Sequence, residues 1–115
     1  MLRGEIRLVD LAPAFPGEAD KFRPCVVVSN DAANLTAARL GRGVVTVVPL
    51  TTATGWLAGF HVFLPASRTG LHTDSKAQAE QVRSVSFERV GRRVGVLDAA
   101  AARDLGDALR VHLDL

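Results

Sequence analysis

Short apolar runs, each ended within a few residues by glycine or proline or by a polar residue, set the strongest limit on what this chain can fold into. Three runs have strand length and are rich in β-branched or aromatic residues: 24–30 (PCVVVSN), 43–51 (GVVTVVPLT) and 60–65 (FHVFLP). Segment 3–11 (RGEIRLVDL) alternates apolar and polar residues, as a half-buried strand does. We therefore expect several short strands joined by turns and loops, with Pro49 at a sheet edge or a bend.

Two segments favour helix instead. Asp31 is the expected N-cap of a short helical piece over AANLTAARL that ends at Gly41, and Asp98 the expected N-cap of a C-terminal helix. In the second segment one face repeats at helical spacing, with Leu105, Ala108, Leu109 and His112. The pattern predicts a mainly β (α+β) domain: a small β-barrel of five or six strands with a short helix and a C-terminal helix.

Composition narrows the class of protein without identifying it. The 115 residues are enough for one domain, 1–115, with 48% hydrophobic and 23% charged residues. We find no apolar stretch of membrane-spanning length and no export signal at the N-terminus, and the lone Cys25 excludes a disulfide within the chain, so we expect a cytoplasmic protein. Most of the 14 basic residues are arginine. This bias fits either a nucleic-acid partner or a GC-rich genome.

Several kinds of site are absent from the sequence. The three histidines, His61, His72 and His112, are scattered and lack metal-ligand spacing, so we expect no metal site. The chain has no phosphate-binding glycine motif, no GxSxG and no cysteine–histidine nucleophile signature. We expect no cofactor. The remaining candidates are polar residues at strand ends, which can converge on one side of a small barrel.

Arg23 is the most unusual of these polar residues. It stands at the start of an apolar strand, and Pro24 restricts its backbone to extended conformations. It serves either a functional site or a tertiary salt bridge with Asp10 or Glu18. The other candidates also have ordinary structural interpretations: a turn and helix cap for Asn30 and Asp31, strand ends for Thr51 and Thr52, and a solvated strand face for Gln78 and Glu80.

Several motifs in a fixed order resemble one known family. They are RGEI near the N-terminus, GE…KFRPCVVVSN over residues 17–30, VPLT at 48–51 and SKAQAEQVR at 75–83. This order is similar to that of the MazF/PemK toxins, which are the endoribonucleases of type II toxin–antitoxin pairs, and the similarity covers nearly the whole chain. It implies an SH3-like barrel, of the kind shared by CcdB, PemK and MazF, that acts as a homodimer.

The resemblance also implies a reaction. Such toxins inhibit growth by cutting single-stranded RNA (mRNA, possibly tRNA or rRNA) at short sequences without a metal: the 2′-hydroxyl attacks the adjacent phosphorus and leaves a 2′,3′-cyclic phosphate and a 5′-hydroxyl. Carried over by motif, the catalytic pair is Arg23 and Thr51, with Glu80 as candidate general base. The residues implied to hold RNA are Lys21, Phe22, Ser75, Gln78, Gln81 and Arg83. Loops 12–22 and 52–59 would flank this site, where Phe15, Phe22 and Trp56 either stack on bases or pack against the protein.

The resemblance implies one macromolecular partner besides RNA. It is a MazE-like antitoxin with an acidic, partly disordered tail that occupies the arginine site, and any contact with DNA would be made only through that antitoxin. No membrane partner is expected. The alternative is a non-catalytic, gyrase-binding toxin like CcdB, with the same barrel. That branch depends on a C-terminal Trp-Gly-Ile, whereas this chain ends VHLDL.

Overall fold

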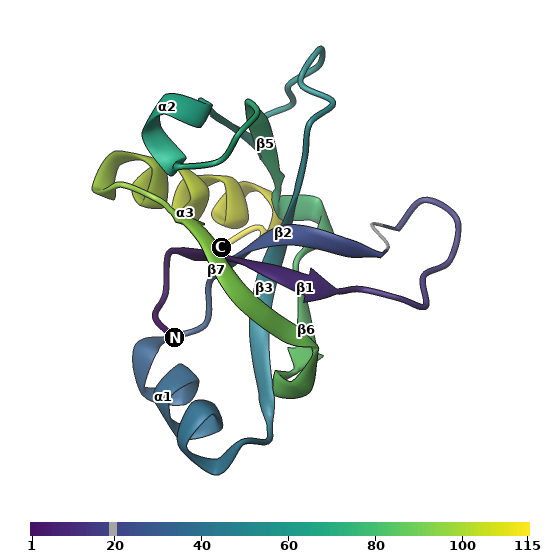
Figure 1. Ribbon diagram of the computed structural model, residues 1–115. Helices are drawn as coiled ribbons and strands as arrows, with labels where there is room; N and C mark the ends of the chain where they lie inside the picture. Colours follow the sequence, from purple (N-terminus) through teal and green to yellow (C-terminus); the bar gives the residue numbers. More distant parts are fainter. Residues whose placement is uncertain (19–20) are drawn as a thin grey trace.

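The computed structural model describes residues 1–18 and 21–115, and these residues build one antiparallel sheet flanked by helices (Figure 1). Its strands are β1 (Glu5–Asp10), β2 (Phe22–Val27), β3 (Val44–Thr51), β4 (His61–Leu64), β5 (Ser75–Gln78), β6 (Arg83–Ser86) and β7 (Val90–Val96). The α-helices are α1 (Asp31–Leu40), α2 (Ala66–Thr69) and α3 (Ala99–Leu113), and two 3-10 turns are η1 (Ala79–Gln81) and η2 (Phe87–Arg89). The predicted loop 12–22 falls partly on residues 19–20, which lie outside the described residues.

Strand β3 organises the sheet because it changes partner along its length. On one side it pairs with β2; on the other it pairs first with β6 over Val44–Val47 and then with β5 over Leu50–Thr51. Pro49 falls in the gap between these last two ladders, where its missing N–H interrupts neither of them. Pro49 thus lies inside β3, where the strand changes partner, and not at the strand's end as expected.

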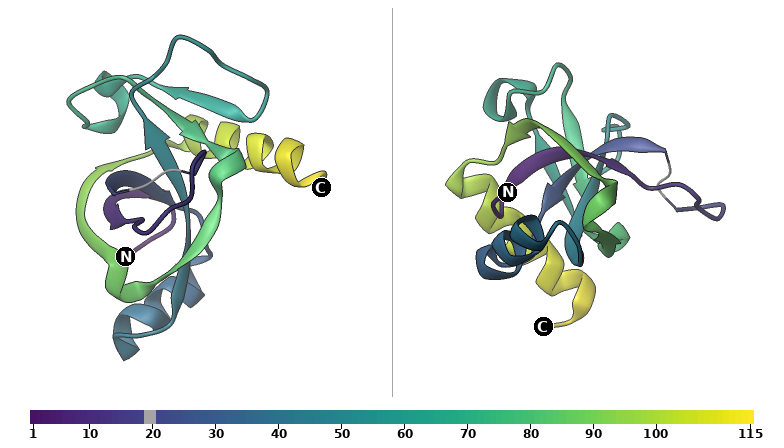
Figure 2. Two further views of the ribbon diagram at one scale, coloured as in Figure 1. Left: turned by 90° about the vertical axis from the view of Figure 1, so that its right-hand side faces the viewer. Right: turned by 60° about the horizontal axis from the view of Figure 1, so that its bottom comes forward.

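The sheet curves strongly but does not close. Its strand order is β4-β5-β3-β2-β1-β7, with β6 attached to β3, and among the described residues no ladder joins the two end strands (Figure 2). The mainly β (α+β) fold with a C-terminal helix is confirmed, although the sheet does not close into a complete barrel. The 3-10 turn η1 separates β5 from β6. These two short strands therefore pair with different parts of β3 and do not form one continuous strand.

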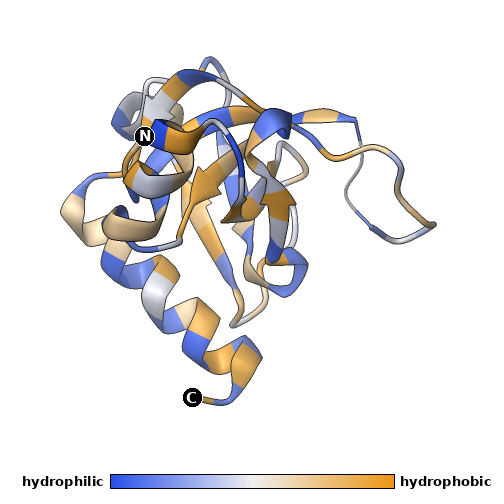
Figure 3. Cartoon of the chain, turned by 90° about the horizontal axis from the view of Figure 1, so that it is seen from below, coloured by the Kyte–Doolittle hydropathy of each residue, from blue (hydrophilic) through white to orange (hydrophobic). Residues whose placement is uncertain are grey.

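Two apolar clusters lie on opposite faces of this curved sheet. The larger one joins Ile6, Val26, Val48 and Leu50 to the buried side of α3, including Leu105. The smaller one gathers around Val9, Cys25 and Val47, with Ala37 of α1. Figure 3 shows hydrophobic stretches in the central strands and a mixture of hydrophobic and hydrophilic residues along α3, as in a helix with one buried face.

Two of the three predicted helix ends agree with the structure. Gly41 ends α1 in the left-handed conformation, and the Asp98 carboxylate caps α3 by accepting from the Ala101 N–H at 2.8 Å. The N-cap of α1, however, is Asn30, whose Oδ1 accepts from the Ala33 N–H at 2.8 Å. Asp31 instead accepts from the backbone N–H of Arg3 at 2.7 Å. Helix α2 lies in a segment expected to be loop.

Within residues 1–18 and 21–115, no helix has both the length and the apolar character needed to cross a membrane.

Candidate active site

Arg23 and Thr51, 28 positions apart in the sequence, lie on one face of the sheet. The β2–β3 ladder ends at the pair Cys25–Pro49. Arg23 lies two residues from Cys25 in β2 and Thr51 two residues from Pro49 in β3, so strand alternation places both on the face of that pair. On its other side Thr51 pairs directly with Lys76 of β5. Residues directly opposite in an antiparallel ladder project from the same face, so all three side chains emerge on one side of the sheet.

The same face continues across β5 to β4. Gln78 follows Lys76 by two residues and pairs with His61, so it shares that face. We call the set Arg23, Thr51, Lys76, Gln78 and His61 the polar strip. It crosses four strands. The intervening residues of β3, β4 and β5, namely Leu50, Val62 and Ala77, project to the other face into the larger apolar cluster.

Two arginines stand at one end of the polar strip. Arg83 pairs with Val47, which places it on the same face as Cys25 and Arg23. Burial raises the pKa of the Cys25 thiol to about 12, and the nearby positive charges of Arg83 and Arg23 act in the opposite direction. Cys25 is thus a packed neutral thiol, and both guanidinium groups lie close enough to it to affect its ionisation. Two arginines on one face of the sheet favour a phosphate ligand.

Thr51 presents a hydroxyl that can still donate. Its Oγ1 accepts a hydrogen bond from the Ala53 N–H at 3.2 Å, at the point where β3 leaves the sheet. A hydroxyl that accepts one bond retains its own hydrogen for donation. The backbone contact orients the oxygen, while the half-buried side chain remains within reach of a ligand.

Lys76 holds loop 52–59 against this face. Its side chain is almost fully buried, and Nζ donates to the carbonyl oxygen of Trp56 at 2.6 Å while lying 5.1 Å from the centroid of the indole ring. A cation over an indole face adds attraction beyond the hydrogen bond. Trp56 itself is 65% exposed, so loop 52–59 offers a large aromatic surface at the rim of the polar strip.

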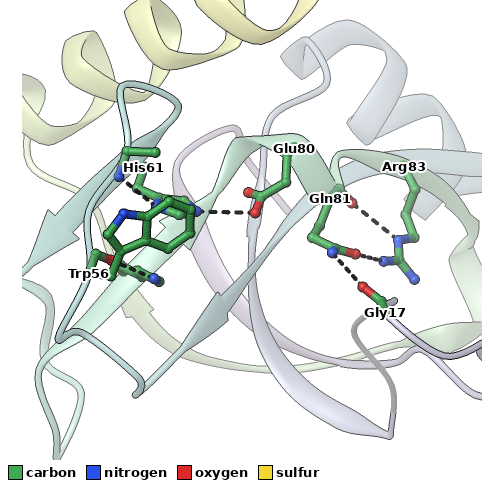
Figure 4. Close-up of polar contacts among 8 residues, drawn as sticks. Gly17, Trp56, His61, Glu80, Gln81 and Arg83 are labelled. Carbon is green, nitrogen blue, oxygen red and sulfur yellow. Dashed lines mark hydrogen bonds and ion pairs between the residues drawn. The ribbon is translucent and has the colours of Figure 1, made fainter.

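His61 and Glu80 form the central polar contact of Figure 4. The His61 side chain is 1% exposed, and its Nε2 lies 3.1 Å from Oε2 of Glu80 in η1. The ring also lies edge-on to Trp56, with centroids 5.1 Å apart. The other carboxylate oxygen of Glu80, Oε1, is buried without a hydrogen-bond partner among the described residues, as is Oε1 of Gln78.

Gln81 and Arg83 link the strip to the loop between β1 and β2. Gln81 Nε2 donates to the Gly17 carbonyl at 3.0 Å, and its Oε1 accepts from Arg83 Nη2 at 2.7 Å (Figure 4). Arg83 Nε also donates to the Gln81 carbonyl at 3.2 Å. These bonds connect the Arg83 guanidinium, through Gln81, to the β1–β2 loop at Gly17.

Three of the predicted RNA-holding residues do not join the strip. Ser75 projects to the opposite face of β5, is buried, and donates to the Thr73 carbonyl at 3.2 Å. Phe22 precedes Arg23 in β2 and points to the other face by strand alternation, with 69% of its surface exposed. Lys21 lies just outside the strand, exposed and in the left-handed conformation.

The sequence interpretation missed two members of the site. Lys76 belongs to the SKAQAEQVR motif but was overlooked, although period-two alternation with Gln78 would have placed both on one face. His61 was considered only as a metal ligand. Its partner lies 19 positions away in a 3-10 turn, and no spacing rule in the sequence brings the two together.

Comparison with known proteins identifies the family of the chain. The family model described as "PemK-like, MazF-like toxin of type II toxin-antitoxin system" matches residues 2–113. The chain is 56% identical over 115 residues to Endoribonuclease MazF9 of Mycobacterium tuberculosis, covering all of this chain and 98% of that protein. It is 29% identical over 115 residues to Endoribonuclease EndoA of Bacillus subtilis, covering 98% of this chain and 94% of that protein.

Solved structures show the same fold. A mycobacterial endoribonuclease in complex with its cognate antitoxin superposes with a TM-score of 0.78 and 26% sequence identity, covering all of this chain and 96% of that one. A MazF crystal structure from Deinococcus radiodurans reaches a TM-score of 0.83 at 21% identity, covering all of this chain and 97% of that one, and it supports the fold alone. The family match extends over almost the entire sequence, and the chain belongs to the PemK-like, MazF-like toxins of type II toxin–antitoxin systems.

Proposed function

We propose that this toxin is an endoribonuclease that cleaves single-stranded RNA at the polar strip. The observation that supports the proposal is the shared face of Arg23, Thr51 and Arg83, with Lys76 paired to Thr51. Such a group of cations with a hydroxyl suits a phosphodiester. The 56% identity to a protein named as an endoribonuclease supports the same activity. No observation favours the alternative of a non-catalytic, gyrase-binding toxin.

The reaction we propose is an attack of the RNA 2′-oxygen on the adjacent phosphorus. The P–O5′ bond breaks, which gives a 2′,3′-cyclic phosphate and a 5′-hydroxyl. Negative charge grows on the non-bridging oxygens, and one well-placed donor in such a site lowers the barrier by about 2.7–4 kcal/mol. Arg23 donates its guanidinium fork to these oxygens and Thr51 donates its hydroxyl hydrogen. The leaving 5′-oxygen takes its proton from water, because an arginine side chain does not deprotonate.

Glu80 is the proposed acceptor of the 2′-hydroxyl proton. It lies beside the strip in η1, next to Gln81, and one of its oxygens is already held by His61. A positioned general base contributes about 10²–10⁴-fold to the rate. Since no step in this scheme uses a Lewis acid, we expect cleavage to continue in the presence of a chelator.

Substrate and antitoxin are proposed to use the same face. Gln78, Gln81 and Arg83 would contact the RNA backbone and base edges, and Trp56 of loop 52–59 would offer a stacking surface for an unpaired base. Lys21 and Phe22, exposed at the start of β2, would extend that contact, whereas Ser75 is too buried to do so directly. The antitoxin tail, being acidic, would compete for Arg23 and Arg83. The active form is proposed to be a homodimer.

Replacing Arg23 with lysine tests the mechanism directly. Lysine keeps the charge but loses the planar fork, so we expect kcat/KM on a long single-stranded RNA to fall about 100-fold or more in buffer containing EDTA. The matched control is Arg103→Lys on the exposed side of α3, which should cleave at the wild-type rate. Unchanged cleavage by Arg23→Lys and by Arg23→Ala would refute the proposed site. A strict requirement for a divalent metal would refute the proposed reaction.

A further inference from the structure

His61 is held on both sides of its ring, and the two contacts come from different elements. Its Nδ1 accepts a hydrogen bond from the backbone N–H of Ala58 in loop 52–59, with the two nitrogens 3.0 Å apart. Because Nδ1 acts as acceptor, it carries no hydrogen, and the ring must have its hydrogen on Nε2. The Nε2–H therefore donates to Oε2 of Glu80 at 3.1 Å. A backbone contact thus fixes the tautomer, and the tautomer fixes the contact with Glu80.

We propose that His61 is a positioning residue that couples the seating of loop 52–59 to the orientation of the Glu80 carboxylate. When the loop is seated, the Ala58 N–H occupies Nδ1, and Nε2–H holds one oxygen of Glu80. When the loop lifts, Nδ1 loses its donor and the ring is no longer restricted to the tautomer that donates to Glu80. This inference rests on the proposed function only in giving Glu80 a role in cleavage; the coupling itself involves the protein alone.

One carboxylate oxygen of Glu80 is buried, and this explains why its orientation would matter for cleavage. Its Oε1 has no hydrogen-bond partner among the described residues and no exposure to solvent, although about a quarter of the side chain as a whole is exposed. A buried, unpartnered carboxylate oxygen is unfavourable and is relieved by a donor from a ligand or water. We assign an RNA 2′-hydroxyl as that donor. Because loop 52–59 is linked to Glu80 through His61, movement of the loop changes the surroundings of this carboxylate.

Three contacts near His61 hold loop 52–59 in place. Besides the Ala58 N–H, these are the Lys76 ammonium, which donates to the Trp56 carbonyl at 2.6 Å, and the edge-on contact of Trp56 with the His61 ring. Among the charged groups, Lys76 of β5 lies on the same face of the sheet as His61, and Asp104 and Asp107 of α3 line a small cavity together with His61 and Gly59. The His61 ring is thus held between loop 52–59 and η1.

The competing interpretation is that His61 is only a buried core residue. Two substitutions separate the two roles. His61→Leu fills the space but cannot donate, whereas His61→Gln can still donate an N–H toward Glu80. We expect His61→Leu to lower kcat about 100-fold with little change in KM, since a misplacement of a catalytic group by about 1 Å can cost that much. His61→Gln should recover most of the loss. The matched control, His72→Leu, changes an exposed histidine far from Glu80 and should keep wild-type kcat.

A double-mutant cycle with Glu80→Gln shows whether His61 acts through Glu80. If it does, adding His61→Leu to Glu80→Gln should lower kcat no further. Independent losses that multiply in the double variant, or an unaffected kcat in Glu80→Gln, would overturn the inference. Neither result would touch the role of Arg23, so failure of the coupling and failure of the proposed function are distinguishable.

A second measurement needs no RNA. Trp56 is the one tryptophan of the chain, so its fluorescence reports on loop 52–59 alone. We expect the acrylamide quenching constant of Trp56 to rise in Glu80→Gln and in His61→Leu, with no further rise when the two are combined. His72→Leu should leave it unchanged. Quenching in Glu80→Gln identical to that of the wild type would overturn the coupling, even if His61→Leu proves too unstable to measure.

Discussion

The two faces of strands β3, β4 and β5 differ sharply although the residues that form them alternate along the same backbone. One face presents Leu50, Ala77 and Val62, all buried in the larger apolar cluster. The other presents Thr51 and Lys76, paired with each other and flanked by Gln78. A shift of strand register by one residue would exchange the two sets, so the apolar face fixes the register that also assembles the polar strip. In this fold, apolar packing on one face of the sheet positions the polar side chains on the other face.

The two faces are also covered differently. Helix α3 lies on the apolar face and contributes Ala101, Leu105 and Ala108 to its cluster. The polar strip is bordered by loops: 52–59, held through Lys76 and His61, and the β1–β2 loop, held at Gly17 by Gln81. Side-chain hydrogen bonds hold these loops, with far less buried apolar surface than α3 contributes. We therefore expect the cover of the polar strip to open at lower free energy than that of the apolar face.

Leu50→Ala should give the largest effect and act on stability alone. Leu50 is 2% exposed within the larger cluster, and truncating such a side chain typically costs about 2–5 kcal/mol in the free energy of unfolding. Urea denaturation followed by circular dichroism would measure the loss. The folded variant should retain wild-type kcat/KM on RNA, because the strip keeps its register. A large fall in kcat/KM in the fully folded variant would show that the faces are not separable.

Thr51→Val changes the neighbouring residue and should have the converse effect. Valine has nearly the shape of threonine without the donor, so the free energy of unfolding should change by less than about 1 kcal/mol. We expect kcat/KM to fall about 100- to 1,000-fold, which corresponds to the loss of one transition-state donor. Thr51→Ser, which keeps the hydroxyl, is the control and should retain most of the activity. Full activity in Thr51→Val would remove Thr51 from the proposed mechanism.

The sequence predicted the apolar face of the sheet more accurately than the face that carries the polar strip. Hydrophobic period and turn residues were sufficient for β1, β3, β4 and α3, because these signals are local. The position of Arg23 and Thr51 on one face depends on the ladder between β2 and β3, which no local pattern contains; only the family resemblance named both residues. The His61–Glu80 contact was not predicted at all, since it requires β4, loop 52–59 and η1 to meet.

Errors in the sequence interpretation have similar physical causes. Asp31 and Asn30 are both good N-cap residues, and the choice between them depends on Arg3, whose backbone N–H binds the Asp31 carboxylate. The sequence predicted five or six strands, whereas η1 divides the segment 75–86 into two strands that pair with β3 at different places. Both outcomes were set by contacts between residues distant in sequence.

Asp98 gives the smallest predicted effect and tests the apolar face alone. The Ala101 N–H, and after it the Arg68 guanidinium at 2.9 Å, hold the pKa of this carboxylate below its usual value. Because the folded state favours the ionised form, Asp98 contributes fully to the free energy of unfolding above the unfolded-state pKa of about 3.9. This contribution is lost as pH falls through the lower pKa of the folded state.

The difference in unfolding free energy between wild type and Asp98→Ala should thus shrink from pH 6 to pH 3, measured by urea denaturation. Glu88→Ala, at an exposed carboxylate of η2, is the control. A difference independent of pH would show that Asp98 stabilises α3 without its charge, and RNA cleavage at pH 7 should be unaffected because α3 lies against the other face of the sheet.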